Sequence, residues 1–166
     1  MVETQGAAER LQPSLLDRLT DDNPESQVES RDGRVIDIGR LRAIVLRDLS
    51  YLFNTVNQRE ILDLAKFPRA AKSGLNYGVN DLAGHSNTAM KAQELQRGLK
   101  AAVDVFEPRV IPGTLEIRVG DQANRSEALI VLDIRGEIWA YPLPIELYMR
   151  TQLDLSTGAI SVSEKT

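Results

Sequence analysis

The sequence predicts an α+β domain in which N-terminal helices pack on a C-terminal antiparallel β-sheet. Apolar residues recur at helical spacing through the first two thirds of the chain, and at every second position after residue 110. The segments with the two-residue period are joined by short turns, which connect antiparallel neighbours. No repeat or linker divides the 166 residues. We therefore expect a flexible tail over residues 1–10 and one domain over residues 11–166.

Three stretches have the helical pattern. A short amphipathic helix is expected within residues 11–19, and longer helices are expected over about 38–56 and 86–106. Ser86 or Asn87 would cap the last of these. Pro108 would end it, because a residue before proline is disfavoured in the helical region.

The segment between the two long helices is harder to interpret. Residues 61–64 fit either a helical turn or a short extended piece, which Pro68 would break. Two glycines, Gly74 and Gly78, bracket apolar residues in the run 73–78. We interpret that run as a tight, fixed path of the chain.

The last third of the chain has the pattern of strands. Residues 115–119 alternate between apolar and polar side chains, 128–134 is apolar on both faces like a central strand, and 145–155 predicts a long half-buried strand. We expect a hairpin turn at Arg135-Gly136-Glu137, leading into residues 138–140. A further turn at 156–158 would lead into the last strand at 160–162.

Composition excludes several classes of site and partner. The chain has no cysteine and one histidine, so it has no disulfide, no thiolate metal site and no multi-histidine zinc site. A net charge of −4 argues against a nucleic-acid partner. No segment approaches the roughly 20 apolar residues of a membrane span, and residues 1–10 lack a signal peptide's apolar run. We expect a soluble cytoplasmic protein with no cofactor and no direct membrane insertion.

Signatures of catalysis are largely missing. The sequence has no phosphate-binding loop, no dinucleotide-binding turn and no nucleophile elbow, and we interpret His85 as a loop residue. Glycoside hydrolysis needs only two carboxylates, for instance Glu107 with Asp104 or Glu116. With 24 acidic residues such a pair is always available, so it has little weight. Trp139 and Tyr141 are interpreted as sheet aromatics, although an exposed tryptophan would mark an interface.

The turn Glu107-Pro108-Arg109 departs from a local rule. A helix C-terminus carries partial negative charge and favours cations, yet Asp104 and Glu107 stand at this one. Residues two apart in an extended chain face the same way, so Glu107 and Arg109 would project side by side while Pro108 limits their freedom. The turn is either a rigid docking element or a place where Arg109 simply neutralises Glu107 and the helix end. Unfavourable local choices tend to collect at functional sites.

The residues around this turn match a known family. The run 106–110, between an amphipathic helix and the strand that begins at Leu115, resembles the family of TssE and the gene-25 baseplate wedge protein of contractile-tailed phages. Three further segments agree. Its N-terminal helix resembles residues 14–19, its connecting segment resembles residues 73–82, and its closing turn resembles residues 153–158. The N-terminal helix favours the type VI secretion branch over the phage branch.

The resemblance implies a non-enzymatic cytoplasmic subunit of a baseplate docked at the inner membrane complex. Glu107, Pro108 and Arg109 would bind the other wedge subunits, of the TssF and TssG type. The sheet would start sheath polymerisation by pairing with a strand of a sheath subunit. The alternatives are a peptidoglycan hydrolase, because the family has also been labelled lysozyme-like, and a regulatory adaptor that binds a response regulator.

Overall fold

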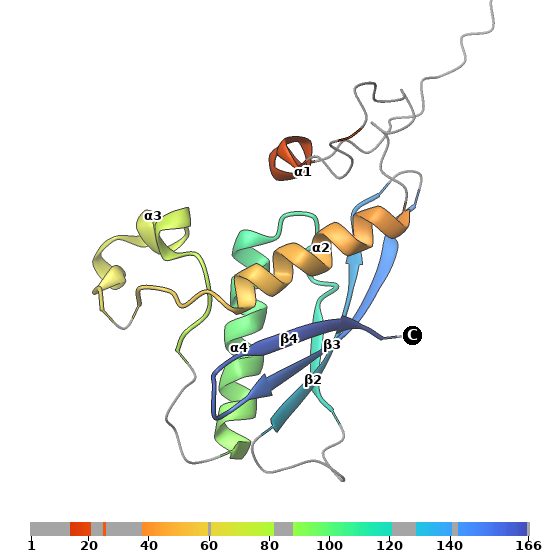
Figure 1. The fold of residues 1–166 in the computed structure, drawn as a ribbon. Helices are drawn as coiled ribbons and strands as arrows, with labels where there is room; N and C mark the ends of the chain where they lie inside the picture. Colours follow the sequence, from red (N-terminus) through yellow and green to blue (C-terminus); the bar gives the residue numbers. More distant parts are fainter. Residues whose placement is uncertain are drawn as a thin grey trace, which may run out of the picture.

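The computed structural model describes residues 14–20, 25, 38–59, 61–81, 88–120, 129–140 and 143–165. In these residues the helices come first and the strands last. The helices are α1 (Leu15–Leu19), α2 (Ile38–Phe53), α3 (Pro68–Ala71) and α4 (Thr88–Phe106), with two short 3-10 helices, η2 (Leu64–Lys66) and η3 (Gly74–Asn76). The long helices α2 and α4 cross one another on one side of the sheet (Figure 1).

The strands form one antiparallel sheet with the order β1-β2-β3-β4. They are β1 (Glu116–Val119), β2 (Leu129–Ile138), β3 (Ile145–Asp154) and β4 (Ile160–Glu164). Each strand pairs with its neighbour in sequence, as short connections require. The predicted α+β class, with helices on an antiparallel sheet, is therefore confirmed.

The core lies between the helix pair and one face of the sheet. Apolar residues three and four apart place the buried face of each long helix against the alternate residues of the strands. The buried helix residues are Leu41, Ile44, Val45, Leu49, Leu52, Phe53, Ala92, Leu95, Leu99, Ala102 and Val103. Those of the strands include Ile117, Ile130, Leu132, Ile134, Ile138, Ile145, Leu147, Met149, Leu153 and Ile160.

The predicted hairpin turn at Arg135-Gly136-Glu137 is wrong. These residues lie inside β2, where Gly136 pairs with Leu147 of β3. The glycine is a strand residue rather than a turn residue, and a β-carbon on it would make only ordinary contacts, 3.5 Å from Leu115 Cδ1 and 3.7 Å from Val110 Cγ1. The chain that leaves α4 runs beside the end of β2, where Val110 forms an antiparallel bridge with Ile138, and Trp139 lies just beyond that end.

Several predicted boundaries shift. Helix α1 begins at Leu15 with Ser14 as its N-cap, and α2 ends at Phe53, earlier than predicted. Pro68, predicted to break the preceding piece, is the first residue of α3. A missing N–H costs nothing at that position. The alternation predicted over 145–155 is confirmed by the burial pattern of β3. The tail, the caps Ser86 and Asn87, His85 and Tyr141 lie outside the described residues.

The turn predicted at 156–158 is confirmed, with Gly158 at a φ of 73° between β3 and β4.

Among the described residues, no helix has the length and apolar character that a membrane span requires.

Candidate partner-docking site

The Glu107-Pro108-Arg109 turn is fixed at both ends by backbone hydrogen bonds. On the helix side, the Glu107 N–H donates to the Val103 carbonyl at 3.0 Å. On the sheet side, the Trp139 N–H donates to the Arg109 carbonyl at 2.8 Å, and Val110 forms an antiparallel bridge with Ile138. The turn is therefore a rigid junction between α4 and the sheet.

Glu107 and Arg109 bind one another in a two-pronged ion pair. Arg109 donates from Nε to Glu107 Oε1 at 2.6 Å and from Nη2 to Glu107 Oε2 at 2.5 Å. The backbone N–H of Arg109 also donates to Oε1, at 3.2 Å. The Glu107 side chain is only 4% exposed, whereas that of Arg109 is 26% exposed. The two side chains lie side by side, and Glu107 is turned inward while Arg109 reaches the surface.

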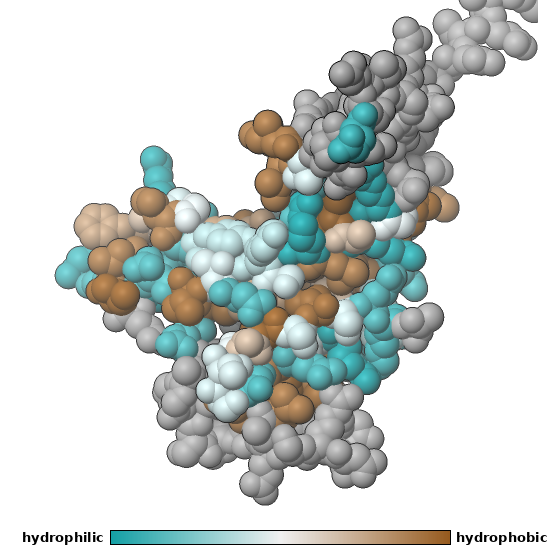
Figure 2. All heavy atoms as spheres, in the orientation of Figure 1, coloured by the Kyte–Doolittle hydropathy of each residue, from teal (hydrophilic) through white to brown (hydrophobic). Residues whose placement is uncertain are grey.

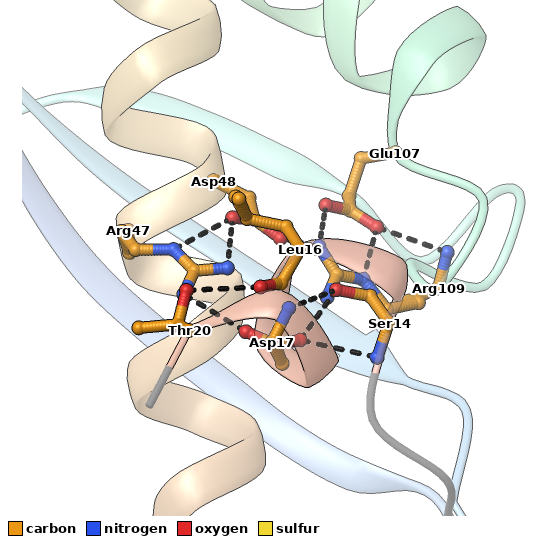
Figure 3. Close-up of polar contacts among 8 residues, drawn as sticks. All are labelled: Ser14, Leu16, Asp17, Thr20, Arg47, Asp48, Glu107 and Arg109. Carbon is orange, nitrogen blue, oxygen red and sulfur yellow. Dashed lines mark hydrogen bonds and ion pairs between the residues drawn. The ribbon is translucent and has the colours of Figure 1, made fainter. Parts of the chain in front are cut away.

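A second carboxylate, from α2, joins this pair. Arg109 Nη2 donates to Asp48 Oδ2 at 2.6 Å. The other oxygen of Asp48 accepts from Arg47, at 3.0 Å from Nε and 2.7 Å from Nη2. Arg47 Nη1 lies 2.8 Å from Asp17 Oδ1 of α1. Figure 3 shows the alternation of acid and base that links the turn to both helices.

Helix α1 is held at the end of this network by polar contacts. Ser14 and Asp17 form a capping box, in which the Asp17 N–H donates to the Ser14 hydroxyl oxygen at 3.4 Å and the Ser14 backbone N–H donates to the Asp17 carboxylate at 3.1 Å. Three leucines of the helix, Leu15, Leu16 and Leu19, are exposed. The ion pair between Asp17 and Arg47 therefore holds α1 in place, with little burial of apolar side chains.

The network changes the acid–base properties of its members. Burial alone would lower the pKa of Arg109, but the hydrogen bonds and charges of Glu107 and Asp48 outweigh burial and raise that pKa. Burial would likewise raise the pKa of Asp17, yet Ser14 and Arg47 lower it below its ordinary value. The pKa of Arg47 is raised as well, so both arginines are charged at neutral pH.

A comparison with known protein families decides the class of the protein. The family model described as baseplate wedge protein gp25 matches residues 39–143, which is most of the chain and includes the turn. The chain belongs to the gp25 baseplate wedge family. The resemblance predicted from the sequence is confirmed at this level. No curated protein and no solved structure matched the chain.

Members of this wedge family are structural components that interact with other baseplate proteins. The site in this gp25-family chain agrees with a structural role. Both oxygens of Glu107 accept hydrogen bonds from Arg109, and its side chain is only 4% exposed, so this carboxylate is held in an internal ion pair. The other carboxylates considered for hydrolysis pair elsewhere, Asp104 with Lys100 and Glu116 with Arg118.

The sequence did not identify three members of the site of this gp25-family chain. Arg47 and Asp48 look like ordinary polar-face residues of an amphipathic helix, and Asp17 looks like part of a helix cap. Asp48 lies 61 positions from Arg109 in the chain. Only the packing of α2 beside the end of α4 brings these side chains together, so no local pattern indicates their role.

Proposed function

We propose that the chain is a TssE-like structural subunit of a type VI secretion baseplate, assembled in the cytoplasm at the inner membrane complex. Its Glu107-Pro108-Arg109 turn docks onto wedge subunits of the TssF and TssG type. One observation carries this proposal. Two carboxylates from different elements fix the Arg109 guanidinium, while no described residue accepts a hydrogen bond from its Nη1 group.

The three residues of the turn have different roles in this proposal. Arg109 offers its Nη1 group, for which the described part of the chain provides no acceptor, to a carboxylate or to carbonyl groups of the partner, a geometry that suits the planar guanidinium. Glu107 is buried, so it positions Arg109 instead of contacting the partner. Pro108 is exposed and restricts the backbone between them.

The docking role is tested by co-purification with the TssF- and TssG-like subunits. We expect Arg109→Lys to lose the wedge subunits, because lysine keeps the charge but cannot make the two-pronged contact. Arg118→Lys is the matched control, since Arg118 also pairs with a carboxylate two residues away but on exposed β1. Equal recovery of wedge subunits with both variants would refute the role of Arg109.

The two edges of the sheet differ in their capacity to receive a strand. At β1, side chains of α4 occupy the outward carbonyls, because Gln96 donates to the Ile117 carbonyl at 2.5 Å and Lys100 donates to the Leu115 carbonyl at 3.3 Å. The helix therefore covers the β1 edge, which is one way in which proteins block strand addition.

Among the described residues, side-chain hydrogen bonds to the outward backbone of β4 occur only at its beginning, at Ile160. Asn54, at the end of α2, donates to the Ile160 carbonyl at 2.7 Å and accepts from the Ile160 N–H at 2.9 Å. Outward and inward groups alternate along an antiparallel strand, so the backbone groups of Val162 and Glu164 also point away from β3. These groups support the proposal that a strand of the first sheath subunits pairs with β4.

A proline substitution tests the β4 edge. Val162→Pro removes an N–H that points away from β3, so all hydrogen bonds between β3 and β4 are kept. We expect the variant to bind wedge subunits normally but to fail in starting sheath polymers. Val162→Thr, which keeps the N–H, is the control. Normal sheath assembly with Val162→Pro would exclude strand addition at β4.

A further inference from the structure

The segment between α2 and α4 forms a small lobe, residues 57–78, that projects away from the sheet (Figure 1). It consists of η2, α3 and η3. Of its described residues only Tyr77, at its end, packs against the core cluster, where its ring meets Phe106 edge to face at 5.3 Å. The rest of the described lobe therefore contributes little to the hydrophobic stabilisation of the domain.

A cluster of hydrogen bonds, here called the hub, holds the base of the lobe in a fixed position through Asn57, Asn76 and Val79. The Asn57 N–H donates to the Val79 carbonyl and the Val79 N–H donates to the Thr55 carbonyl, both at 2.8 Å. Asn76, which is 3% exposed, accepts from the Gln58 N–H at 3.1 Å and donates to the Ala71 carbonyl at 2.9 Å. The buried amides thus fix the lobe in one orientation.

Gly78 closes the same hub. Its φ is +118°, and a β-carbon on it would lie 2.1 Å from the Thr55 carbonyl oxygen. Only glycine lets the returning chain approach the backbone of Thr55, just after α2, so closely. The predicted tight path of residues 73–78 is confirmed by this contact.

The fixed lobe presents large apolar side chains to solvent. Ile61, Leu62, Phe67 and Leu75 are 77%, 52%, 62% and 80% exposed. Figure 2 shows apolar residues gathered on this lobe, at the left of the view. Single exposed apolar residues are ordinary, but a group of them on one rigid projection is typical of an interaction site.

The lobe also differs in charge from the rest of the protein. Residues 57–78 contain four Lys or Arg and two Asp or Glu residues, whereas the whole chain has a net charge of −4. Lys66 pairs with Asp63 at 3.0 Å, and Arg69 lies on α3 next to the exposed Phe67. A surface complementary to the lobe would therefore be apolar with a rim of carboxylates.

We propose that the lobe is a second docking element, which inserts its apolar side chains into a carboxylate-rimmed groove on another baseplate protein. The proposal rests on membership of the wedge family and does not depend on the role of Arg109. A bilayer suits the lobe less well, because membrane-surface binding uses amphipathic helices of several turns. Here α3 has four residues, and η2 and η3 have three each.

The test measures binding of the purified full chain to each purified baseplate protein of the same injection machine. We expect Phe67→Ser/Leu75→Ser to weaken binding to one of them at least tenfold. Arg69→Glu/Lys72→Glu should weaken the same complex and reduce its dependence on salt. The matched control is Ile38→Ser/Val119→Ser, which changes two exposed apolar residues on other elements. Leu75→Ser alone serves if the double variant does not fold.

Three results would overturn the proposal. One is unchanged affinity of the lobe variants for every baseplate protein. Another is lobe-dependent binding to vesicles of phosphatidylglycerol and phosphatidylethanolamine, which would make the lobe a membrane contact. The third is self-association that the lobe variants abolish. Arg109→Lys is measured in parallel, so that a defect in the turn and a defect in the lobe are separated by which complex weakens.

Discussion

Removing either member of the Glu107–Arg109 pair should destabilise the fold, and by different amounts. Breaking a fully buried ion pair costs about 3–5 kcal/mol, because the remaining charge has no partner. Arg109→Ala leaves Glu107, 4% exposed, without the guanidinium that binds both its oxygens. We therefore expect a loss of about 3 kcal/mol in the free energy of unfolding.

Glu107→Ala should cost less. Arg109 is 26% exposed and keeps its hydrogen bond to Asp48, so a loss of about 2 kcal/mol is expected once the partial access to solvent is taken into account. The double variant Glu107→Ala/Arg109→Ala leaves neither charge behind. It should lose about 3 kcal/mol rather than the sum, which corresponds to a coupling energy of about 2 kcal/mol.

Urea unfolding of the wild type and the three variants measures this cycle directly. For a chain of this size a loss of 2 kcal/mol lowers Tm by roughly 4–8 °C, so calorimetry gives an independent reading. If the single effects add within about 0.5 kcal/mol, the pair is not coupled in the folded protein. The buried two-pronged contact would then contribute no coupling between Glu107 and Arg109.

Other predictions follow from contacts away from the turn. Arg150 and Lys165 hold the pKa of Asp133 at about 2, so the contribution of Asp133 to the free energy of unfolding is present above about pH 4 and is lost as the pH falls towards 2. Asp133→Asn should flatten the fall in the free energy of unfolding over that window. A fall as steep as in the wild type would contradict this. Gly78→Ala should destabilise the protein by at least about 2 kcal/mol through its positive φ and the clash with Thr55, while Gly74→Ala, which meets nothing within 4 Å, should not; equal unfolding midpoints would argue against the hub. Purified protein incubated with peptidoglycan should release no muropeptides, and their release would favour the hydrolase alternative.

The fold was largely predictable because its signals are local. Periodic apolar residues predicted α2, α4 and β3, and the closing turn before β4 followed from its glycine. The hairpin at Gly136 was wrong because a glycine inside a strand looks like a turn glycine in sequence, and the pairing of Gly136 with Leu147 places it within β2. Residues 61–76 fold into three short helical pieces that have no period long enough to detect.

The site was predictable only in part, for the same reason. The turn can be noticed in the sequence because Glu107 is a negative residue at the negative end of a helix, and this conflict is visible from neighbouring residues alone. Its stabilising partners come from α2 and α1, and Asp48 is brought to Arg109 by tertiary packing alone. The burial of Glu107, on which its proposed positioning role rests, also depends on that packing.

The central claim is that Arg109 is a docking group held ready by Glu107 and Asp48. Titration calorimetry of the TssF- and TssG-like subcomplex with the wild type, Arg109→Lys and Arg118→Lys tests it most directly. The account predicts that Arg109→Lys raises Kd at least tenfold, that Arg118→Lys leaves it unchanged, and that all three proteins are folded at the temperature of the assay. An unchanged Kd for folded Arg109→Lys would contradict the account.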